Sequence, residues 1–437
     1  MKKMNLILVL ALSLGIGVGL MLTNHGVQKV TAAELNSELP SNYGDFRFPR
    51  EGSLTKDGYP TPLSGKPMIK TNVIAKKKGV SLKEYPEHYI VGEEPLADNE
   101  MRVTVLGSGA PTPVRRAQAC SGYLVELGNG KNFIFDIGPG TTGNLYSMGI
   151  HPALLDKVFI NHLHLDHVGG IFPLFDAMGL ARNTPLQVWG PSGSTPKLGT
   201  KEFTKNIREA AEWHVQSKSK LLPTGGTKII THEIDVSKFS QKEPRQLVYD
   251  KHDVKIYAFP VVHCIEGSLG YRLEWKGLSF VYTADSEPST FEAEQGKGAD
   301  VFIHEVFPSP EDYAASTKMP LEHAKNALSE HTVPSELGQV FSIAKPGLGV
   351  GSHYTLGDAL IDSFFQGVAT TYDGPVLLAH DLSVINVTPE QIVVRQAKTS
   401  MLATVPVAPK LEGVDMNPGK PSESKTPVWL EKTVIKK

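Results

Sequence analysis

The feature that most constrains this chain is the segment His162-Leu163-His164-Leu165-Asp166-His167, which places four metal-capable side chains within six positions. It follows, after Asn161, the largely apolar run Lys157–Ile160, which reads as a buried strand. In an extended segment the first two histidines project to one side and can reach one ion, and the turn after them brings the aspartate and the third histidine to a second position. Three of only fifteen histidines within six positions favour a metal site over a solvated polar loop.

Three further metal-capable residues stand at the ends of predicted strands. These are His263, Asp285 and His353, each preceded by a short run of apolar or small residues. Strand ends are where a rigid scaffold presents functional groups to a loop. Neutral imidazoles and carboxylates suit zinc, and the affinity order of divalent metals favours zinc over manganese or iron. The sequence therefore predicts a zinc site.

Strand patterns recur through the middle of the chain, with helical patterns between and outside them. The expected strands are Met101–Leu106, Ser121–Leu127, Asn132–Ile137, Lys157–Ile160, Lys255–Val262, Leu269–Trp275, Ser279–Tyr282, Val301–Ile303 and, last, Val376–Leu378. The expected helices are Thr142–Met148, Phe203–Val215 and Ser335–Ala344. This order predicts an α/β layered domain over residues 101–400. A Pro/Gly-rich extension (34–100) precedes it, a polar insertion (218–251) interrupts it, and a solvated tail (401–437) follows it.

The first thirty-three residues have the pattern of an export signal. A positive start precedes the uncharged apolar run Leu6–Leu22, and small residues lead to a cleavage point after Ala33. We therefore expect a periplasmic or secreted protein, bound to a membrane only if the segment stays uncleaved. Removal of residues 1–33 leaves 41 basic against 46 acidic residues, a net charge of −5. Such a chain is unlike a nucleic-acid binder that works by bulk charge.

Two cysteines are too few to hold a small scaffold together, and a chain of 437 residues does not need them for that purpose. Cys264, next to His263, is expected to be a buried structural thiol. Spacing leaves open whether it pairs with Cys120.

Taken together, these motifs resemble the metallo-β-lactamase superfamily. The matching features are Leu106-Gly107-Ser108-Gly109, Asp136-Ile137-Gly138-Pro139-Gly140, the histidine cluster and the isolated His, Asp and His after it. The resemblance implies a four-layer αββα sandwich with a two-metal site at one edge of the paired sheets. It also implies the ligands: His162, His164 and His263 for one metal, Asp166, His167 and His353 for the other, and Asp285 for both. Here Ala284 stands where the family commonly has Gly before the Asp.

Within the superfamily, three further segments resemble the ribonuclease Z and arylsulfatase branch. They are Ser268-Leu269-Gly270-Tyr271-Arg272, His304-Glu305 and His331-Thr332. The resemblance implies that Glu305 orients His331, which binds the substrate anion or protonates the leaving group; with Asp166 these are the expected catalytic residues. The alternative is a structural Glu305 and a His331 that caps a helix.

The resulting expectation is an exported hydrolase with two zinc ions per chain, whose bridging hydroxide cleaves a small anionic ester, either a sulfate or a phosphate. We expect a small-molecule ester as substrate and no nucleic acid as partner, because the mature chain is acidic and shows no basic arm for tRNA. A lactonase, a ribonuclease Z-like phosphodiesterase and a non-catalytic metal-binding protein that retains the fold are the alternatives. The oligomeric state is left open.

Overall fold

The computed structural model describes residues 18–23, 26–31, 69, 72–111, 118–150, 155–179, 184–218, 225–265, 267–355, 358–399 and 426–435. The chain forms two units, Met1–Gly52 and Ser53–Lys437, and each is described by itself. In the first unit, β1 (Val18–Thr23) and β2 (Gly26–Thr31) pair as an antiparallel hairpin. The rest of the predicted export signal lies outside the described residues. Among the helices that the structure describes, none combines the length and the hydrophobicity needed to span a bilayer.

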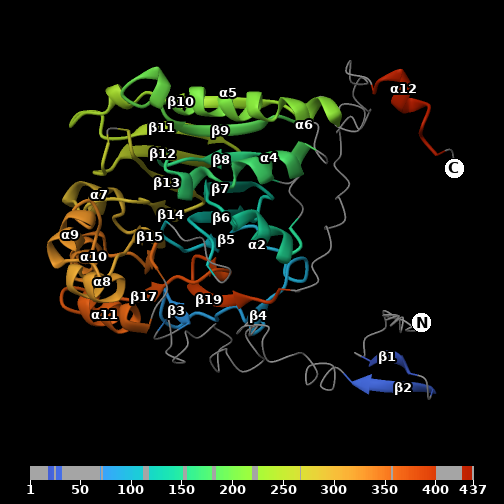
Figure 1. Cartoon of the computed structure of the whole chain (residues 1–437). Coiled ribbons are helices and arrows are strands. Elements are labelled where there is room, and N and C mark those ends of the chain that lie inside the picture. Colours follow the sequence, from blue (N-terminus) through green and yellow to red (C-terminus); the bar gives the residue numbers. More distant parts are fainter. Residues whose placement is uncertain are drawn as a thin grey trace. The chain divides into compact units, whose positions relative to one another are not determined.

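Two sheets form the centre of the second unit (Figure 1). The first has the order β10-β9-β8-β7-β6-β5-β18-β19-β3, and β4 also pairs with β19. Its strands are β3 (Val73–Ala75), β4 (His88–Tyr89), β5 (Met101–Gly107), β6 (Gly122–Leu127), β7 (Asn132–Ile137), β8 (Lys157–Phe159), β9 (Leu186–Pro191), β10 (Ile229–Ile234), β18 (Ser383–Val387) and β19 (Gln391–Ala397).

The second sheet runs in sequence order from β11 to β17. Its strands are β11 (Gln246–Lys251), β12 (Val254–Pro260), β13 (Leu269–Trp275), β14 (Leu278–Tyr282), β15 (Val301–Glu305), β16 (Leu348–Ser352) and β17 (Val376–Leu378). Strands β11 to β14 are antiparallel neighbours, whereas β14 to β17 are parallel. As a result β12, β14, β15 and β16 all end at the same edge of the sheet.

Helices lie outside the two sheets. Those in the first half are α2 (Thr141–Ser147), α3 (Leu165–Val168), α4 (Ile171–Gly179), α5 (Thr200–Ala210) and α6 (Glu212–Ser217). Those in the second half are α7 (Thr290–Gln295), α8 (Pro310–Thr317), α9 (Leu321–Ala327), α10 (Pro334–Ala344) and α11 (Asp358–Val368), which gather on one side in Figure 1. Near the C-terminus, α12 (Val428–Glu431) is exposed and lies in the predicted solvated tail.

Three hydrophobic clusters define the layers. In β6, Tyr123 and Val125 belong to the cluster between the sheets, while Leu124 belongs to the cluster under the helices of the first half. This alternation follows from the two-residue period of a strand. Across the sheets, the rings of Phe135 and Phe280 lie 5.0 Å apart. A third cluster packs the second sheet against α7, α10 and α11. The predicted four-layer αββα sandwich is confirmed.

Several strands fall where none was expected. The polar insertion contains β10 and β11, which extend one edge of each sheet, and the extension contributes β3 and β4. Strands β10 and β11 are only partly buried and carry polar residues, and β3 and β4 are only three and two residues long, so none has the sustained apolar pattern of a central strand. Val376–Leu378 is not the last strand, since β18 and β19 follow it and return to the first sheet.

Replacing Phe280 by Ala tests the packing between the sheets. Phe280 is fully buried there, so we expect Phe280→Ala to lower the free energy of unfolding by about 3–5 kcal/mol. Trp213→Ala is the control, because Trp213 is 83% exposed on α6 and should cost less than about 0.5 kcal/mol. Denaturant unfolding followed by circular dichroism measures both; equal losses would contradict the assignment of Phe280 to the core.

Candidate metal centre

The predicted metal ligands come together at the edge where β8, β12, β14 and β16 end. The loop after β8 carries His162 and His164 and leads into α3, which holds the next two predicted ligands. Strands β12, β14 and β16 end shortly before His263, Asp285 and His353. Both sheets therefore contribute to one site, as the fold requires of a centre at their shared edge.

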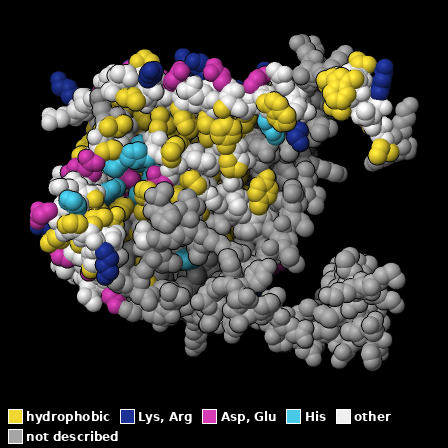
Figure 2. All heavy atoms as spheres, viewed as in Figure 1, with side chains coloured by type: hydrophobic (Ala, Val, Ile, Leu, Met, Phe, Trp, Pro, Cys, Tyr) yellow, Lys and Arg dark blue, Asp and Glu magenta, His cyan; other side chains and the backbone are white. Residues whose placement is uncertain are grey.

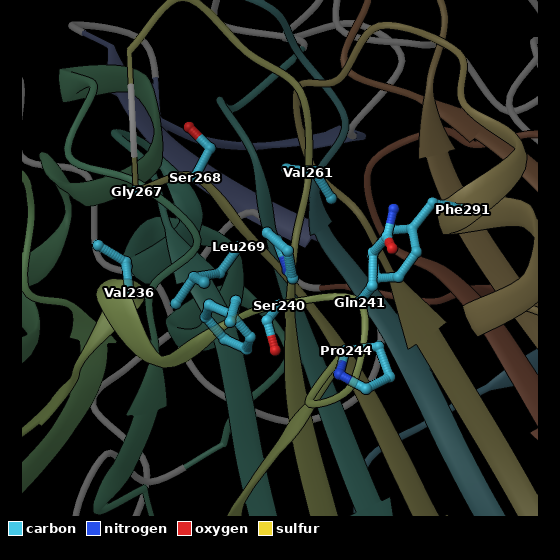
Figure 3. Close-up of a pocket in the computed structure, with 11 residues that line it drawn as sticks. Val236, Ser240, Gln241, Pro244, Val261, Gly267, Ser268, Leu269 and Phe291 are labelled. Atoms are coloured by element: carbon cyan, nitrogen blue, oxygen red, sulfur yellow. The ribbon is translucent and has the colours of Figure 1, made fainter.

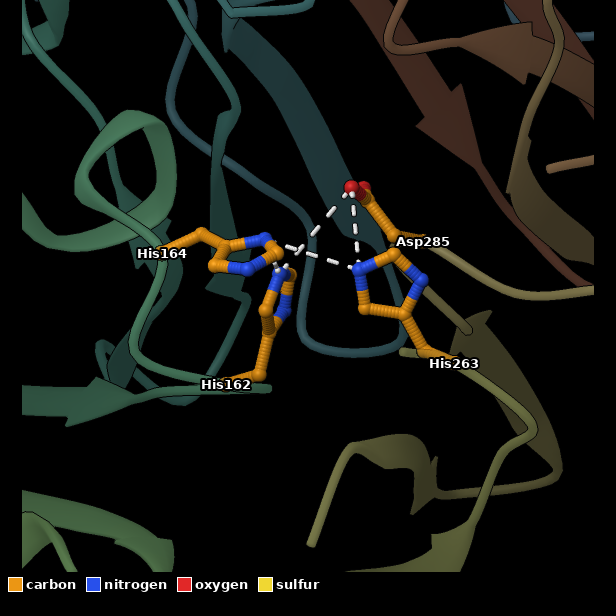
Figure 4. A group of neighbouring side chains, drawn as sticks. All are labelled: His162, His164, His263 and Asp285. Atoms are coloured by element: carbon orange, nitrogen blue, oxygen red, sulfur yellow. Dashed lines mark hydrogen bonds and ion pairs between the residues drawn. The ribbon is translucent and has the colours of Figure 1, made fainter. Parts of the chain in front are cut away.

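The first ligand group consists of His162, His164 and His263, and Figure 4 shows it with Asp285. His164 Nδ1 lies 3.0 Å from His162 Nε2 and 3.5 Å from His263 Nε2. Asp285 Oδ2 lies 3.9 Å from His162 Nε2 and 3.8 Å from His263 Nε2. One ligand atom from each of the four residues falls within 4.8 Å of all the others.

The second ligand group consists of Asp166, His167 and His353. It faces Oδ1, the other oxygen of the Asp285 carboxylate. Asp285 Oδ1 lies 3.1 Å from His167 Nε2 and 3.2 Å from His353 Nε2. Asp166 Oδ2 lies 3.0 Å from His353 Nε2 and 3.3 Å from His167 Nε2. The structure thus brings all seven predicted ligands together as two groups that share Asp285.

This donor set fits metal ions. Asp285 Oδ1 is buried and accepts no hydrogen bond, although two ring nitrogens lie within 3.2 Å of it. The carboxylate oxygen lies close to the two ring nitrogens without forming a hydrogen bond to either. The three atoms therefore face a common position between them, as the ligands of a metal ion do. Imidazole nitrogens and carboxylate oxygens are donors that zinc accepts. Each Asp285 oxygen faces its own ligand group, so this one side chain can contact two ions.

The site's own charges favour cations. Burial and the neighbouring His167 hold the pKa of His162 well below its usual range, so this ring is neutral and able to bind metal. Burial alone would lower the pKa of His353, but the carboxylates of Asp285, Asp166 and Glu305 outweigh it and raise that pKa to about 10, so a metal ion bound by this ring would displace its proton. The pKa of Asp285 is held well below its usual range despite burial, with His353 as the largest opposing influence. The carboxylates are therefore ionised and attract positive charge.

Three residues at the site adopt left-handed backbone conformations. They are Asp136 (φ 54°), Ala284 (φ 56°) and His353 (φ 54°), each just beyond or at the end of a strand. Such conformations cost of order 1–3 kcal/mol for a residue other than Gly, and they persist where the surroundings fix them. The value at Ala284 explains why glycine suits this position in the family: the chain must turn sharply there to aim Asp285.

Asp136 is a functional residue to which sequence reasoning gave no role. Its Oδ2 lies 2.7 Å from His167 Nδ1, and it accepts a hydrogen bond from the Tyr282 hydroxyl at 2.8 Å. Its Oδ1 accepts the Asn161 N–H at 2.9 Å. Because His167 donates from Nδ1, its Nε2 stays free for a metal. The available signal was an aspartate at a strand end, directly before Ile137-Gly138-Pro139-Gly140.

Glu305 and His331 lie together beside the second ligand group. His331 Nδ1 is 2.7 Å from Glu305 Oε2, which is in turn 3.7 Å from His353 Nδ1. Burial lowers the pKa of His331, but the Glu305 carboxylate outweighs it and the pKa is raised. His331 does not cap α10, whose N-cap position is Val333. The pair is adjacent, as the resemblance implied.

Cys264 differs from its prediction. The expected buried structural thiol is exposed, and its Sγ lies 3.6 Å from His164 Nε2. The thiol follows His263 on the loop after β12, where the chain has left the sheet. Cys120 is buried, and both cysteines are free.

Comparison with known proteins gives one family, relatives that are similar in sequence, and solved structures that are similar in fold. The model of the family "Anti-Pycsar protein Apyc1" matches residues 101–316, slightly less than half of the chain. Ribonuclease Z of Mycobacterium marinum is 26% identical over 298 residues, which cover 66% of this chain and 99% of the relative. Ribonuclease Z of Brevibacillus brevis is 28% identical, covering 52% and 80%. The metallo-β-lactamase-fold protein YhfI of Bacillus subtilis has 21% identity and a TM-score of 0.49, covering 66% and 100%.

The paired sheets, the helices outside them and the two ligand groups on a shared aspartate are those of the metallo-β-lactamase fold, and the ribonuclease Z relatives support a hydrolase of that superfamily. Within that superfamily the chain resembles ribonuclease Z, a similarity that extends over nearly the whole length of the Mycobacterium marinum enzyme. The predicted superfamily and the predicted resemblance to ribonuclease Z are confirmed.

The expectation of a small-molecule ester without a nucleic-acid partner is wrong. The two relatives from Mycobacterium marinum and Brevibacillus brevis are ribonucleases, and the first is matched over 99% of its length. The net charge of −5 was a poor basis for excluding a nucleic-acid partner, because it averages over the whole mature surface. A phosphodiester is held locally, by metal ions and the few side chains around them, so the charge of distant surface says little about it.

Asp136→Asn tests the support of the second ligand group. Loss of the carboxylate that fixes His167 should lower metal affinity by about 10–100-fold. Competition with a chromogenic chelator measures this affinity. Asp250→Asn is the matched control, because Asp250 is an exposed aspartate on β11 and should leave affinity unchanged. Equal affinity of both variants would show that Asp136 does not support the centre.

Proposed function

We propose that this protein is a dinuclear-zinc phosphodiesterase of the ribonuclease Z type. The observation that carries the proposal is the shared Asp285, whose two oxygens face two separate ligand groups. The first ligand group would hold one zinc ion, the second would hold the other, and Asp285 would contact both. Two bound zinc ions supply hydroxide at neutral pH and stabilise negative charge on an attacked phosphate.

The chain's own contribution beyond the ligands is the Glu305–His331 pair. With Nδ1 on Glu305, the ring of His331 is fixed in orientation and its Nε2 remains available. The ring of Phe307 packs against it at a tilt of 32°, with centroids 4.2 Å apart, and holds it further. In its protonated form His331 can give the Nε2 proton to the departing oxygen or donate a hydrogen bond to the phosphate. Asp166, in the second ligand group, completes the residues proposed for catalysis.

A phosphodiester is the preferred substrate class because the ribonuclease Z relatives match the chain over most of their own length. Sulfate esters present a similar tetrahedral anion, and a lactone needs the same nucleophile, so both belong in the test. The complete ligand set argues against a non-catalytic protein, in which such buried donors would be free to diverge.

Variants of the centre test the activity. Bis(4-nitrophenyl) phosphate and a short single-stranded RNA should both be cleaved by the zinc-loaded protein. His164→Ala should remove a ligand and nearly all turnover, whereas His331→Asn should lower kcat by about 10²–10⁴-fold with metal content unchanged. His252→Asn, at the exposed turn between β11 and β12, is the control and should retain full activity.

Full activity in His164→Ala would overturn the metal-centred reaction. Turnover of 4-nitrophenyl sulfate or a lactone, with no cleavage of either phosphodiester, would keep the metal-centred reaction and reject the proposed substrate class.

We also propose that the protein is exported and cleaved after Ala33, on the strength of the sequence pattern in residues 1–33. Expression of the full chain in a bacterial host should yield extracytoplasmic protein whose mass is that of a chain beginning at Glu34. A chain that lacks residues 2–33 should stay in the cytoplasm. Full-length protein found only in the cytoplasm would contradict export, without bearing on the chemistry of the centre.

A further inference from the structure

A groove of about 500 Å³ opens where the insertion meets the ends of β12 and β13 (Figure 3). Its apolar walls are formed by Val236, Phe239, Pro244, Val261, Leu269 and Phe291. Figure 3 shows Val236 and Phe291 on opposite sides, with Leu269 between them. The two phenylalanines come from separate elements, the segment after the short 3₁₀ helix Val236–Lys238 and α7. The groove is therefore built by parts of the chain that lie far apart in sequence.

One polar side chain in the wall, that of Ser268, is buried without a hydrogen-bond partner. Ser268 is only 3% exposed, and its Oγ makes no hydrogen bond. A buried hydroxyl left unpaired costs of order 1–3 kcal/mol. Ser268 lines the groove, and the exposed side chain of Gln241 lies at the groove too. A ligand for this groove is thus mostly apolar, with polar atoms at its edge.

The groove and the candidate metal centre are held by the same backbone contacts. The Val261 N–H donates to Ser268 O at 3.1 Å, and the Leu269 N–H donates to Asn161 O at 3.1 Å. Asn161 directly precedes His162, and Val261 lies two residues before His263, a span of at most about 7 Å. Val262 and Ile265 on the same loop are exposed hydrophobic residues.

We propose that this groove binds the base of the nucleotide whose phosphodiester lies at the metal centre, an inference that rests on the proposed phosphodiesterase activity. A nucleobase is a flat apolar ring with donors and acceptors at its edge, and proteins bind such rings by stacking on aromatic side chains. Phe239 and Phe291 supply aromatic surface, and the Ser268 hydroxyl supplies an edge contact. An alkyl chain would fill the walls and leave Ser268 unpaired, so a heterocycle fits the groove better.

Two substrates with one leaving group isolate the base. Methyl 4-nitrophenyl phosphate and thymidine 5′-(4-nitrophenyl phosphate) are both phosphodiesters that release 4-nitrophenol, and only the second carries a nucleoside. The zinc-loaded protein should show kcat/KM at least about tenfold higher for the thymidine ester, as expected from stacking of one base.

Groove variants then locate the source of that preference. Phe291→Leu keeps an apolar side chain and removes the ring, and Ser268→Ala removes only the hydroxyl. Each should lower kcat/KM for the thymidine ester by about five- to tenfold and change that for the methyl ester less than twofold. Trp213→Leu is the matched control, an aromatic replaced outside the groove, and should change neither. An unchanged preference in both groove variants would overturn the proposal.

A binding measurement separates failure of this proposal from failure of the proposed function. Calorimetry of the zinc-loaded protein compares uridine 5′-monophosphate with ribose 5-phosphate, which has the same sugar phosphate and no base. Tighter binding of the nucleotide, lost in Phe291→Leu, supports the groove even if neither ester is hydrolysed, in which case only the phosphodiesterase activity fails. Equal binding of the two compounds overturns the groove even if both esters are hydrolysed.

Discussion

The carboxylate of Asp285 is the interaction on which the rest of the site depends. It is buried at the meeting edge of both sheets, and a buried ionised carboxylate is stable only when positive charge or hydrogen bonds compensate it. Its two oxygens divide six other ligands into two groups, so its orientation sets the distance between them. The sharp turn at Ala284 fixes that orientation. The strained backbone and the ligand geometry are thus one feature.

Sequence could identify the ligands because each belongs to a local pattern: a dense cluster, or a lone residue at the end of an apolar run. The αββα layers followed from the resemblance that those patterns carry. The role of Asp136 did not follow, because it depends on a contact with His167, thirty-one positions away. Strands β10 and β11 were missed since edge strands are only partly buried. The exposed Cys264 was missed because burial of a loop residue is set by packing that no local pattern records.

Two surfaces of the site draw on different parts of the chain. The metal ligands come from the ends of strands at the edge of the sandwich, whereas the groove is completed by the part of the insertion between β10 and β11. The strand ends that carry the ligands suit the chemistry common to the superfamily. The insertion suits recognition of the group that is attached to the reacting phosphate. If the groove binds the base as proposed, recognition rests on a small apolar surface with few charged atoms, about which overall charge says little.

Strand β5, at Met101–Gly107, pairs on one side with β6 and on the other with β18, where Val384 lies opposite Thr104. Apart from the short strands β3 and β4, β5 is the earliest strand of this sheet, and it pairs with β18, the last but one. Until β18 is made, β5 is an unpaired edge in what becomes the interior of a sheet, and such edges attract other chains. Pairing over so long a separation is also slow. During synthesis this protein is consequently exposed to misassembly almost until its end, so a helper that shields β5 would matter more here than for a sheet built from neighbouring strands.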